Sequence, residues 1–306
     1  MLQYHLNHTL SIQHLHENNY MKISGFTIIK NAIINDYPVV ESIRSVLPLV
    51  HEMIVAVGDC ADDTRAMITA IGSDKIKIID TVWDPSLREG GKVLAVETDK
   101  AFAQIDPESD WAFYIQADEV VHEQYYPAIL DAAQKYLDDK NVEGLLFKYT
   151  HFYGSFDYVG DSRKWYHREI RIIRNDKNIH AYRDAQGFRK QNRKLRVKLI
   201  DAYIFHYGWV KDSTTMKEKI NNLSKLWHDD AGAALTAELF DFNEFDSLER
   251  YKGTHPSVMQ QRIANKNLDI TLDISKKKMS FKKRVLYWIE KKTGHRLFDY
   301  RNYKII

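Results

Sequence analysis

Apolar and polar positions along residues 22–121 predict strands and helices in regular alternation. Short apolar runs are typical of buried strands, and the last run, residues 111–115, is unbroken. Between the runs, apolar residues recur at helical spacing. The strands are expected at residues 22–29, 53–57, 75–82 and 111–115, and the helices at residues 37–50, 65–71 and 93–102. This alternation predicts an α/β fold whose parallel sheet is covered by helices on both faces.

Polar residues cluster where each predicted strand ends, at the edge where open α/β sheets bind their ligands. The clusters are Lys30–Asn31, residues 58–64, residues 90–92 and residues 116–119. One acid of residues 58–64 is expected to cap the following helix, which leaves the others for ribose hydroxyls or a base. Lys92 follows two glycines and suits a diphosphate, although a solvated lysine fits the same pattern. Asp118 could hold a hard divalent cation shared with phosphates, or could belong to a solvated turn.

The second half of the chain has a less regular pattern. Strands are expected at residues 144–149, 169–174 and 199–205, and the last of these runs into His206. Aromatic residues are dense from 147 to 166, where they could pack on sugar rings or fill the core. Helices are expected at residues 125–137 and, after the capping pair Asp212–Ser213, along residues 216–226. Residues 229–257 show no clear period.

Composition and charge narrow the class of protein. The chain has 306 residues, 44% of them hydrophobic, and a single cysteine, Cys60, which excludes an internal disulfide framework and favours a reducing, cytoplasmic setting. No stretch has the roughly 20 apolar residues of a membrane helix. Residues 1–20 contain four histidines without a standard zinc spacing and are interpreted as a disordered extension rather than a metal site.

The net charge of +2 conceals a basic C-terminal segment. Residues 276–304 contain eleven Lys and Arg against two acids, Glu290 and Asp299. Within it, residues 281–289 suit a short basic amphipathic helix. We expect this segment to face an anionic membrane surface rather than nucleic acid, which would place the protein at the inner face of a membrane; a solvated basic helix packed on the acidic body is the alternative.

At this point the ordered set of motifs resembles family 2 glycosyltransferases of the GT-A fold, especially bacterial members that build cell-surface polysaccharide and lipopolysaccharide. The matching pieces are residues 26–31, residues 58–64, Gly91–Lys92, residues 114–119 and residues 206–209. The resemblance implies a GT-A domain over residues 21–210, with residues 211–306 forming a C-terminal helical region. It implies a nucleotide-sugar donor and a saccharide or lipid-linked hydroxyl acceptor.

The resemblance also assigns roles to residues. Those implied to contact the nucleotide are Thr27, Asn31, Asp59, Asp62, Lys92 and Asp118. A divalent cation, Mn²⁺ or Mg²⁺, would bind Asp118 with help from His206. The family motif Asp-x-Asp has lost its first acid here, because Gln116 stands in its place. The implied reaction is a metal-assisted, inverting single displacement, in which a carboxylate takes the proton of the acceptor hydroxyl.

The general base is expected on a loop beyond residues 116–119. Four acids qualify, and Asp184 is preferred because it lies in a polar run before Gly187. Glu169 is the next candidate, although its neighbours Arg168 and Arg171 suggest an ion pair. The remaining two, Asp157 and Asp161, lie among aromatic residues and glycines.

Two rival functions remain open at this stage. A sugar-nucleotide nucleotidyltransferase shares this style of sheet, but the loop after its first strand is glycine-rich, unlike residues 30–35. A catalytically degenerate scaffold that only binds nucleotide-sugars would explain Gln116. P-loop ATPases and simple dehydrogenases are disfavoured, because neither phosphate-binding glycine motif occurs.

Overall fold

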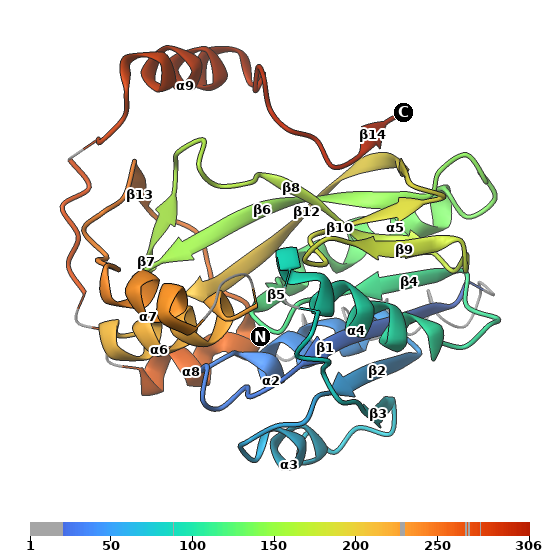
Figure 1. The fold of residues 1–306 in the computed structure, drawn as a ribbon. Coiled ribbons are helices and arrows are strands. Elements are labelled where there is room, and N and C mark those ends of the chain that lie inside the picture. Colours follow the sequence, from blue (N-terminus) through green and yellow to red (C-terminus); the bar gives the residue numbers. More distant parts are fainter. Residues whose placement is uncertain (1–20, 88, 227–229, 267, 269, 276) are drawn as a thin grey trace, which may run out of the picture.

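The computed structural model describes residues 21–87, 89–226, 230–266, 268, 270–275 and 277–306 (Figure 1). The N-terminal extension predicted at residues 1–20 lies outside the described residues. Over the described ranges, eleven strands form one curled sheet and three more form a small hairpin sheet beside it. Helices cover both faces of the large sheet.

The first half of the large sheet is parallel, as predicted. Its strands are β1 (Ile23–Ile29), β2 (Glu52–Val57), β3 (Ile76–Asp80) and β4 (Trp111–Tyr114), in the spatial order β3–β2–β1–β4. The chain therefore builds outward from β1 to β3 and then returns to the other side of β1. Such a reversal leaves a crevice between the carboxyl ends of the two strands at the switch point, which here are β1 and β4.

The second half of the sheet is mixed. Antiparallel β8 (Arg168–Arg174) joins β4 to β6 (Gly144–Tyr153), and β7 (Ser155–Gly160) and β13 (Leu248–Arg250) follow. The long β12 (Arg196–Trp209) pairs with β6, with β5 (Glu119–Val121) and with β14 (Lys304–Ile305). The predicted C-terminal region thus contributes two strands to the sheet of the predicted GT-A domain.

The unbroken apolar run of β4 is explained by the two cores that it separates. Phe113 faces a cluster with α2 (Val39–Val46), α3 (Thr64–Thr69) and α5 (Tyr126–Lys135). Its neighbour Tyr114 faces a cluster on the opposite side. That second cluster is built on α4 (Lys92–Ala103) and on the hairpin sheet of β9 (Ile179–Tyr182), β10 (Gly187–Lys190) and β11 (Arg193–Lys194). A strand covered on both faces has no position for a polar side chain.

The remaining helices lie at the β7–β13 end and above the sheet (Figure 1). They are α6 (Ser213–Ser224), α7 (Asp230–Glu238), α8 (Gln260–Asn265) and α9 (Phe281–Thr293), and short 3₁₀ turns occur at Leu47–Leu49, Glu89–Gly91, Glu123–Tyr125 and Ser257–Met259. None of the described helices is long and apolar enough to span a membrane. The predicted α/β fold class, with helices on both faces of the sheet, is confirmed.

Candidate active site

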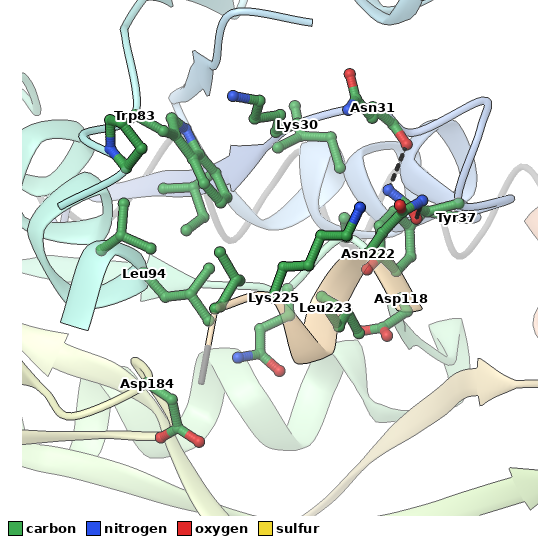
Figure 2. Close-up of a pocket in the computed structure, with 18 of the residues that line it drawn as sticks. Lys30, Asn31, Tyr37, Trp83, Leu94, Asp118, Asp184, Asn222, Leu223 and Lys225 are labelled. Atoms are coloured by element: carbon green, nitrogen blue, oxygen red, sulfur yellow. Dashed lines mark hydrogen bonds between the residues drawn. The ribbon is translucent and has the colours of Figure 1, made fainter. Parts of the chain in front are cut away.

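A cavity of about 480 Å³ opens at the switch point of the sheet, beyond the carboxyl ends of β1 and β4 (Figure 2). Its size is within the range of roughly 300–1,000 Å³ typical of ligand pockets. The strands contribute Ile28, Ile29, Tyr114 and Gln116, and α6 with the residues after it contributes Asn222, Leu223, Lys225 and Leu226. The other polar and aromatic lining residues are Lys30, Asn31, Asn35, Tyr37, Trp83, Asp84, Asp118 and Asp184.

The loop after β1 forms one wall, and Asn31 sets its shape. Asn31 has a positive φ of 54°, which asparagine tolerates better than most residues. Its Oδ1 accepts a hydrogen bond from Ala61 N (2.7 Å), and its carbonyl accepts from Asn35 Nδ2 (2.9 Å). Asn222 Nδ2 on α6 donates to Asn35 Oδ1 (3.1 Å), which ties the helix to this wall.

Asp59 and Asp62, two of the three acids predicted to contact nucleotide, support this wall through hydrogen bonds. Asp59 accepts from Lys30 Nζ (2.7 Å) and from Trp83 N (3.0 Å), so it orients two pocket-lining residues. Asp62 accepts from the backbone nitrogens of Ile33 and Ile34 and from the Thr64 hydroxyl. One acid of this cluster was expected to cap the following helix. Asp62 has a similar role, because its carboxylate binds both the loop after β1 and the first residue of α3.

Asp118 lies between β4 and β5, and the side chains of Lys219 and His206 meet its carboxylate. Lys219 Nζ of α6 donates to Asp118 Oδ2 (3.1 Å) and to the Gly208 carbonyl (2.8 Å), and His206 Nε2 lies 3.6 Å from the same Oδ2. Burial alone would raise the pKa of Asp118, but the charges of Lys219 and His206 hold it well below its usual value. Asp118 is therefore ionised and already paired.

Position 208 has to be glycine for this cluster to form. A Cβ there would collide with Asp118 Oδ2 and would lie 2.8 Å from His206 Nε2. Behind His206, its Nδ1 is 3.2 Å from His151 Nδ1, and His151 Nε2 is 2.7 Å from the Tyr166 carbonyl. Burial and the charge of His206 keep the pKa of His151 well below its usual value, so His151 is neutral. Since a carbonyl only accepts, His151 donates to Tyr166 and His206 Nδ1 donates to His151.

Glu119, the next residue along the chain, has a different role. Its carboxylate receives two hydrogen bonds from Arg171 (2.7 Å each) and one from the Tyr149 hydroxyl (2.7 Å), and both charged side chains are fully buried. In the sequence, Glu119 was only one member of the polar cluster at residues 116–119. Its partners show that it instead joins β5 to β8 and β6 inside the sheet.

The two candidate bases are in unlike surroundings. Asp184 lies in the turn between β9 and β10, flanked by Arg183 (φ 57°) and Ala185 (φ 59°), and it lines the pocket. Glu169 is 4% exposed, is not part of the pocket lining and has no hydrogen-bond partner for Oε2 in the described part of the chain. Desolvation raises the pKa of Glu169 to about 8, so it is mostly protonated near neutral pH.

The predicted site residues are thus divided between the pocket surface and its surroundings. Asn31, Asp118 and Asp184 line the pocket. Thr27 is buried inside β1, Lys92 is exposed at the start of α4, and His206 reaches the site through Asp118. The contact roles of all the predicted site residues stay predictions.

Sequence reasoning missed the lining residues of α6 and the buried Lys219. A signal was present, because Lys219 falls on the apolar stripe of that helix, three residues after buried Met216 and four before Leu223. A charged residue on a buried stripe needs a partner of opposite charge. From the sequence, a buried Lys219 therefore predicts a carboxylate partner, although the sequence does not show which one.

The donor set at Asp118 does not fit a divalent cation as it stands. Mg²⁺ and Ca²⁺ prefer six or more oxygen ligands, whereas one carboxylate and one imidazole meet here and Gln116 adds no charge. In the described ranges no group of three or more His, Cys, Asp or Glu side chains could hold a metal ion. The Lys219 ammonium on Asp118 Oδ2 would also repel a cation at that oxygen.

Among known proteins, only solved structures are similar to this chain. No family model and no curated protein matches the sequence. The structure is similar to the crystal structure of S. aureus TarS 1–349, with 14% identity, a TM-score of 0.38 and coverage of 71% of this chain and 72% of that one. It is also similar to glucosyl-3-phosphoglycerate synthase from Mycobacterium tuberculosis in complex with Mn²⁺, UDP and phosphoglyceric acid, with 18% identity and a TM-score of 0.30. That match covers 46% of each chain, so the protein spans less than half of the synthase. What this chain does therefore has to be inferred from the side chains of its own pocket.

Proposed function

We propose that the protein transfers a sugar from a nucleoside-diphosphate-sugar to a hydroxyl acceptor. The observation that supports this most directly is the pocket at the β1–β4 switch point, which combines an aromatic and amide wall, lysines and three carboxylates. Trp83 and Asn31 suit a base and ribose, and Lys30 and Lys225 suit phosphates. Figure 2 shows Lys225 extending into the pocket, with Asn31 and Asp184 on different sides of it.

The proposed reaction is a single displacement at the anomeric carbon. The acceptor oxygen forms a bond to that carbon while the bond to the diphosphate oxygen breaks, and the electron pair leaves with the nucleoside diphosphate. Asp184 takes the proton of the acceptor hydroxyl, since it is the candidate base that lines the pocket and is not buried. Attack opposite the leaving group inverts the configuration of the sugar carbon.

A donor panel tests the proposed function. Purified protein is incubated with UDP-, GDP-, ADP- and CDP-sugars and mixed saccharide acceptors, and release of nucleoside diphosphate is measured. Asp184→Asn should lower transfer about 10²-fold or more while donor affinity is retained. Asp131→Asn, on the exposed side of α5, is the matched control and should transfer like the wild type.

The rival functions have their own readouts in the same assays. Nucleotide-sugar binding without turnover of any donor would favour the scaffold that Gln116 suggests. Pyrophosphate release from a nucleoside triphosphate and a sugar phosphate would favour the nucleotidyltransferase. An Asp184→Asn variant with wild-type transfer would move the base to another acid.

We further propose that α9 places the enzyme on an anionic membrane surface, where a lipid-linked acceptor of envelope polysaccharide synthesis would be found. One face of α9 holds the body, through Glu290 with Arg163 (2.7 Å) and Lys291 with Asp161 (2.5 Å). Phe281 and Trp288, which are seven residues apart and so share one side of the helix, are 83% and 61% exposed. The basic residues Lys282, Arg284 and Lys292 flank these rings and are exposed. An exposed apolar stripe edged by basic residues suits an anionic bilayer.

Liposome flotation tests this placement. We expect binding to vesicles with anionic lipid at low salt, weaker binding at high salt, and little binding to neutral vesicles. Phe281→Ser/Trp288→Ser should abolish flotation and leave transfer to a soluble acceptor unchanged. Equal flotation with neutral and anionic vesicles, or no flotation at all, would remove the membrane proposal and leave the transferase proposal standing.

A further inference from the structure

The feature that carries a further inference is the lysine that α6 delivers to Asp118. Lys219 is buried, with 7% of its side chain exposed, and its ammonium lies 3.1 Å from Oδ2 of Asp118, a residue that lines the pocket. It also lies 4.7 Å from the centre of the Tyr37 ring, and Tyr37 lines the pocket. Burying a lysine is costly unless it is paired, so this placement is specified by the fold.

The hydrogen-bond geometry leaves Lys219 able to bind an anion. An ammonium group has three N–H donors. Asp118 Oδ2 and the Gly208 carbonyl account for two of them. The third is available to a phosphate oxygen that reaches the carboxylate end of the pocket.

Charge balance points the same way. Asp118 contributes one negative charge and Lys219 one positive charge, while Gln116 contributes none. The Asp118–Lys219 pair is therefore neutral before any donor binds, and His206 beside it adds no negative charge. A divalent cation added to this neutral pair would give it a net charge of +2. An ammonium that is already in place lets the protein meet the charge of the leaving diphosphate itself.

We propose that the Lys219 ammonium, held by Asp118 and Gly208, takes the place of a divalent cation against the donor diphosphate, so that the protein binds nucleoside diphosphates and transfers sugar without metal. This inference rests on the proposed function and names the cation of the same site. Since Lys219 is on the helix that supplies Asn222 and Leu223 to the pocket, the positive charge belongs to one wall of the donor site. Asp118 is then a positioning residue for Lys219.

Titration calorimetry with UDP, GDP, ADP and CDP tests the inference on the full-length protein. The wild type should bind its preferred nucleoside diphosphate in EDTA, with an affinity within about threefold of that in Mn²⁺. Lys219→Met should weaken binding in EDTA by roughly tenfold or more, because a charge-assisted hydrogen bond is lost. Lys219→Arg should recover part of it. The matched control is Lys217→Met, an exposed lysine on the same helix, which should bind like the wild type.

A second variant converts the site. Gln116→Asp/Lys219→Met removes the ammonium and leaves two carboxylates beside His206. It should bind Mn²⁺ alone, as seen by electron paramagnetic resonance, and should bind the nucleoside diphosphate in Mn²⁺ but not in EDTA. Thermal melts identify any variant that fails to fold, and the wild-type comparison needs no variant.

The outcomes separate the two proposals. Wild-type binding that requires Mn²⁺ and is lost in EDTA would overturn the role of Lys219 and leave the transferase proposal intact. Wild-type affinity in folded Lys219→Met, measured in EDTA, would overturn it as well. If no nucleoside diphosphate binds under either condition, the proposed function itself fails, and the inference fails with it.

Discussion

The sheet interior and the pocket wall each hold a buried carboxylate paired with a cation, and the two carboxylates are neighbours in sequence. In the interior, Glu119 is bound by Arg171 through two hydrogen bonds, and both residues belong to strands of one sheet. At the wall, Asp118 is bound by Lys219 through one hydrogen bond, and the lysine comes from a helix. The first pair is enclosed on every side, whereas Asp118 lines a cavity.

The difference shows how adjacent acids acquire separate roles. A planar guanidinium matches both oxygens of a carboxylate, which fixes the pair and leaves it little capacity for another partner. An ammonium is a compact charge with rotatable donors, so it can hold Asp118 and still meet a ligand. We therefore interpret Glu119–Arg171 as structural and Asp118–Lys219 as functional, and three variants can break or sharpen that distinction.

The largest effect is expected from Arg171→Met. The variant leaves Glu119 buried without its cation, and breaking a buried pair in this way costs about 3–5 kcal/mol of unfolding free energy. Urea denaturation measures the loss. Glu119→Gln/Arg171→Met should recover much of it, because no unpaired charge remains. If the unfolding free energy of Arg171→Met lay within about 1 kcal/mol of the wild-type value, as is usual for surface substitutions, the structural role would be contradicted.

Asp118→Asn should lower stability less than Arg171→Met does, and it should lower activity more. Lys219 keeps the Gly208 carbonyl but loses its counter-charge, so we expect a loss of about 1–3 kcal/mol of unfolding free energy. Transfer should fall by roughly 10²-fold or more, because the ammonium is no longer positioned. Denaturation and nucleoside-diphosphate release are measured on the same preparation, with Asp131→Asn as the control. Wild-type turnover would remove Asp118 from the site.

The third test concerns a buried carboxylate that has no cation in hydrogen-bond contact among the described residues. Desolvation raises the pKa of Glu169 to about 8, so the folded protein holds a proton that the unfolded chain releases above its ordinary pKa. Stability from this group is complete below the unfolded pKa and is lost as pH rises toward 8. Each pKa unit corresponds to about 1.4 kcal/mol.

Glu169→Gln imitates the protonated acid and should remove this pH dependence. Its melting temperature should match the wild type near pH 4.5 and exceed it at pH 8. Glu108→Gln, which alters an exposed acid, should change neither. A variant with the same pH profile as the wild type would show that Glu169 is already ionised in the folded protein.

The sequence alone predicted the parallel half of the fold well, because local patterns determine it. The four strands and their helices follow from apolar periods. Asn31 and Asp118 were selected by their place after strands, and Asp184 by its polar run before Gly187. The β9–β10 hairpin was missed because its strands have only four residues each, too few for a clear alternation. Short β13 and β14 were missed for the same reason.

Lys219 and Arg171 could not be assigned because their partners are distant in sequence. Lys219 meets a carboxylate 101 residues away, and Arg171 meets one 52 residues away. A helical pattern predicts which residue is buried, but the three-dimensional fold decides what lies opposite it. The same limit applies to the contact of α6 with the pocket, since the pattern of that helix predicted an apolar face and left its target open.

The last described strand has a consequence for the order in which the protein is made. Asn302 packs against Gly187, its carbonyl accepts from Arg189 Nη1 (3.0 Å), and β14 then pairs with β12. The hairpin that carries Asp184 is thus held by residues translated long after it. Since a chain emerges from the ribosome N-terminus first, the pocket wall formed by the loop after β1 can fold while the hairpin that carries Asp184 still lacks its support. We therefore expect nascent chains stalled before residue 302 to bind the nucleotide of the proposed donor but not to transfer sugar.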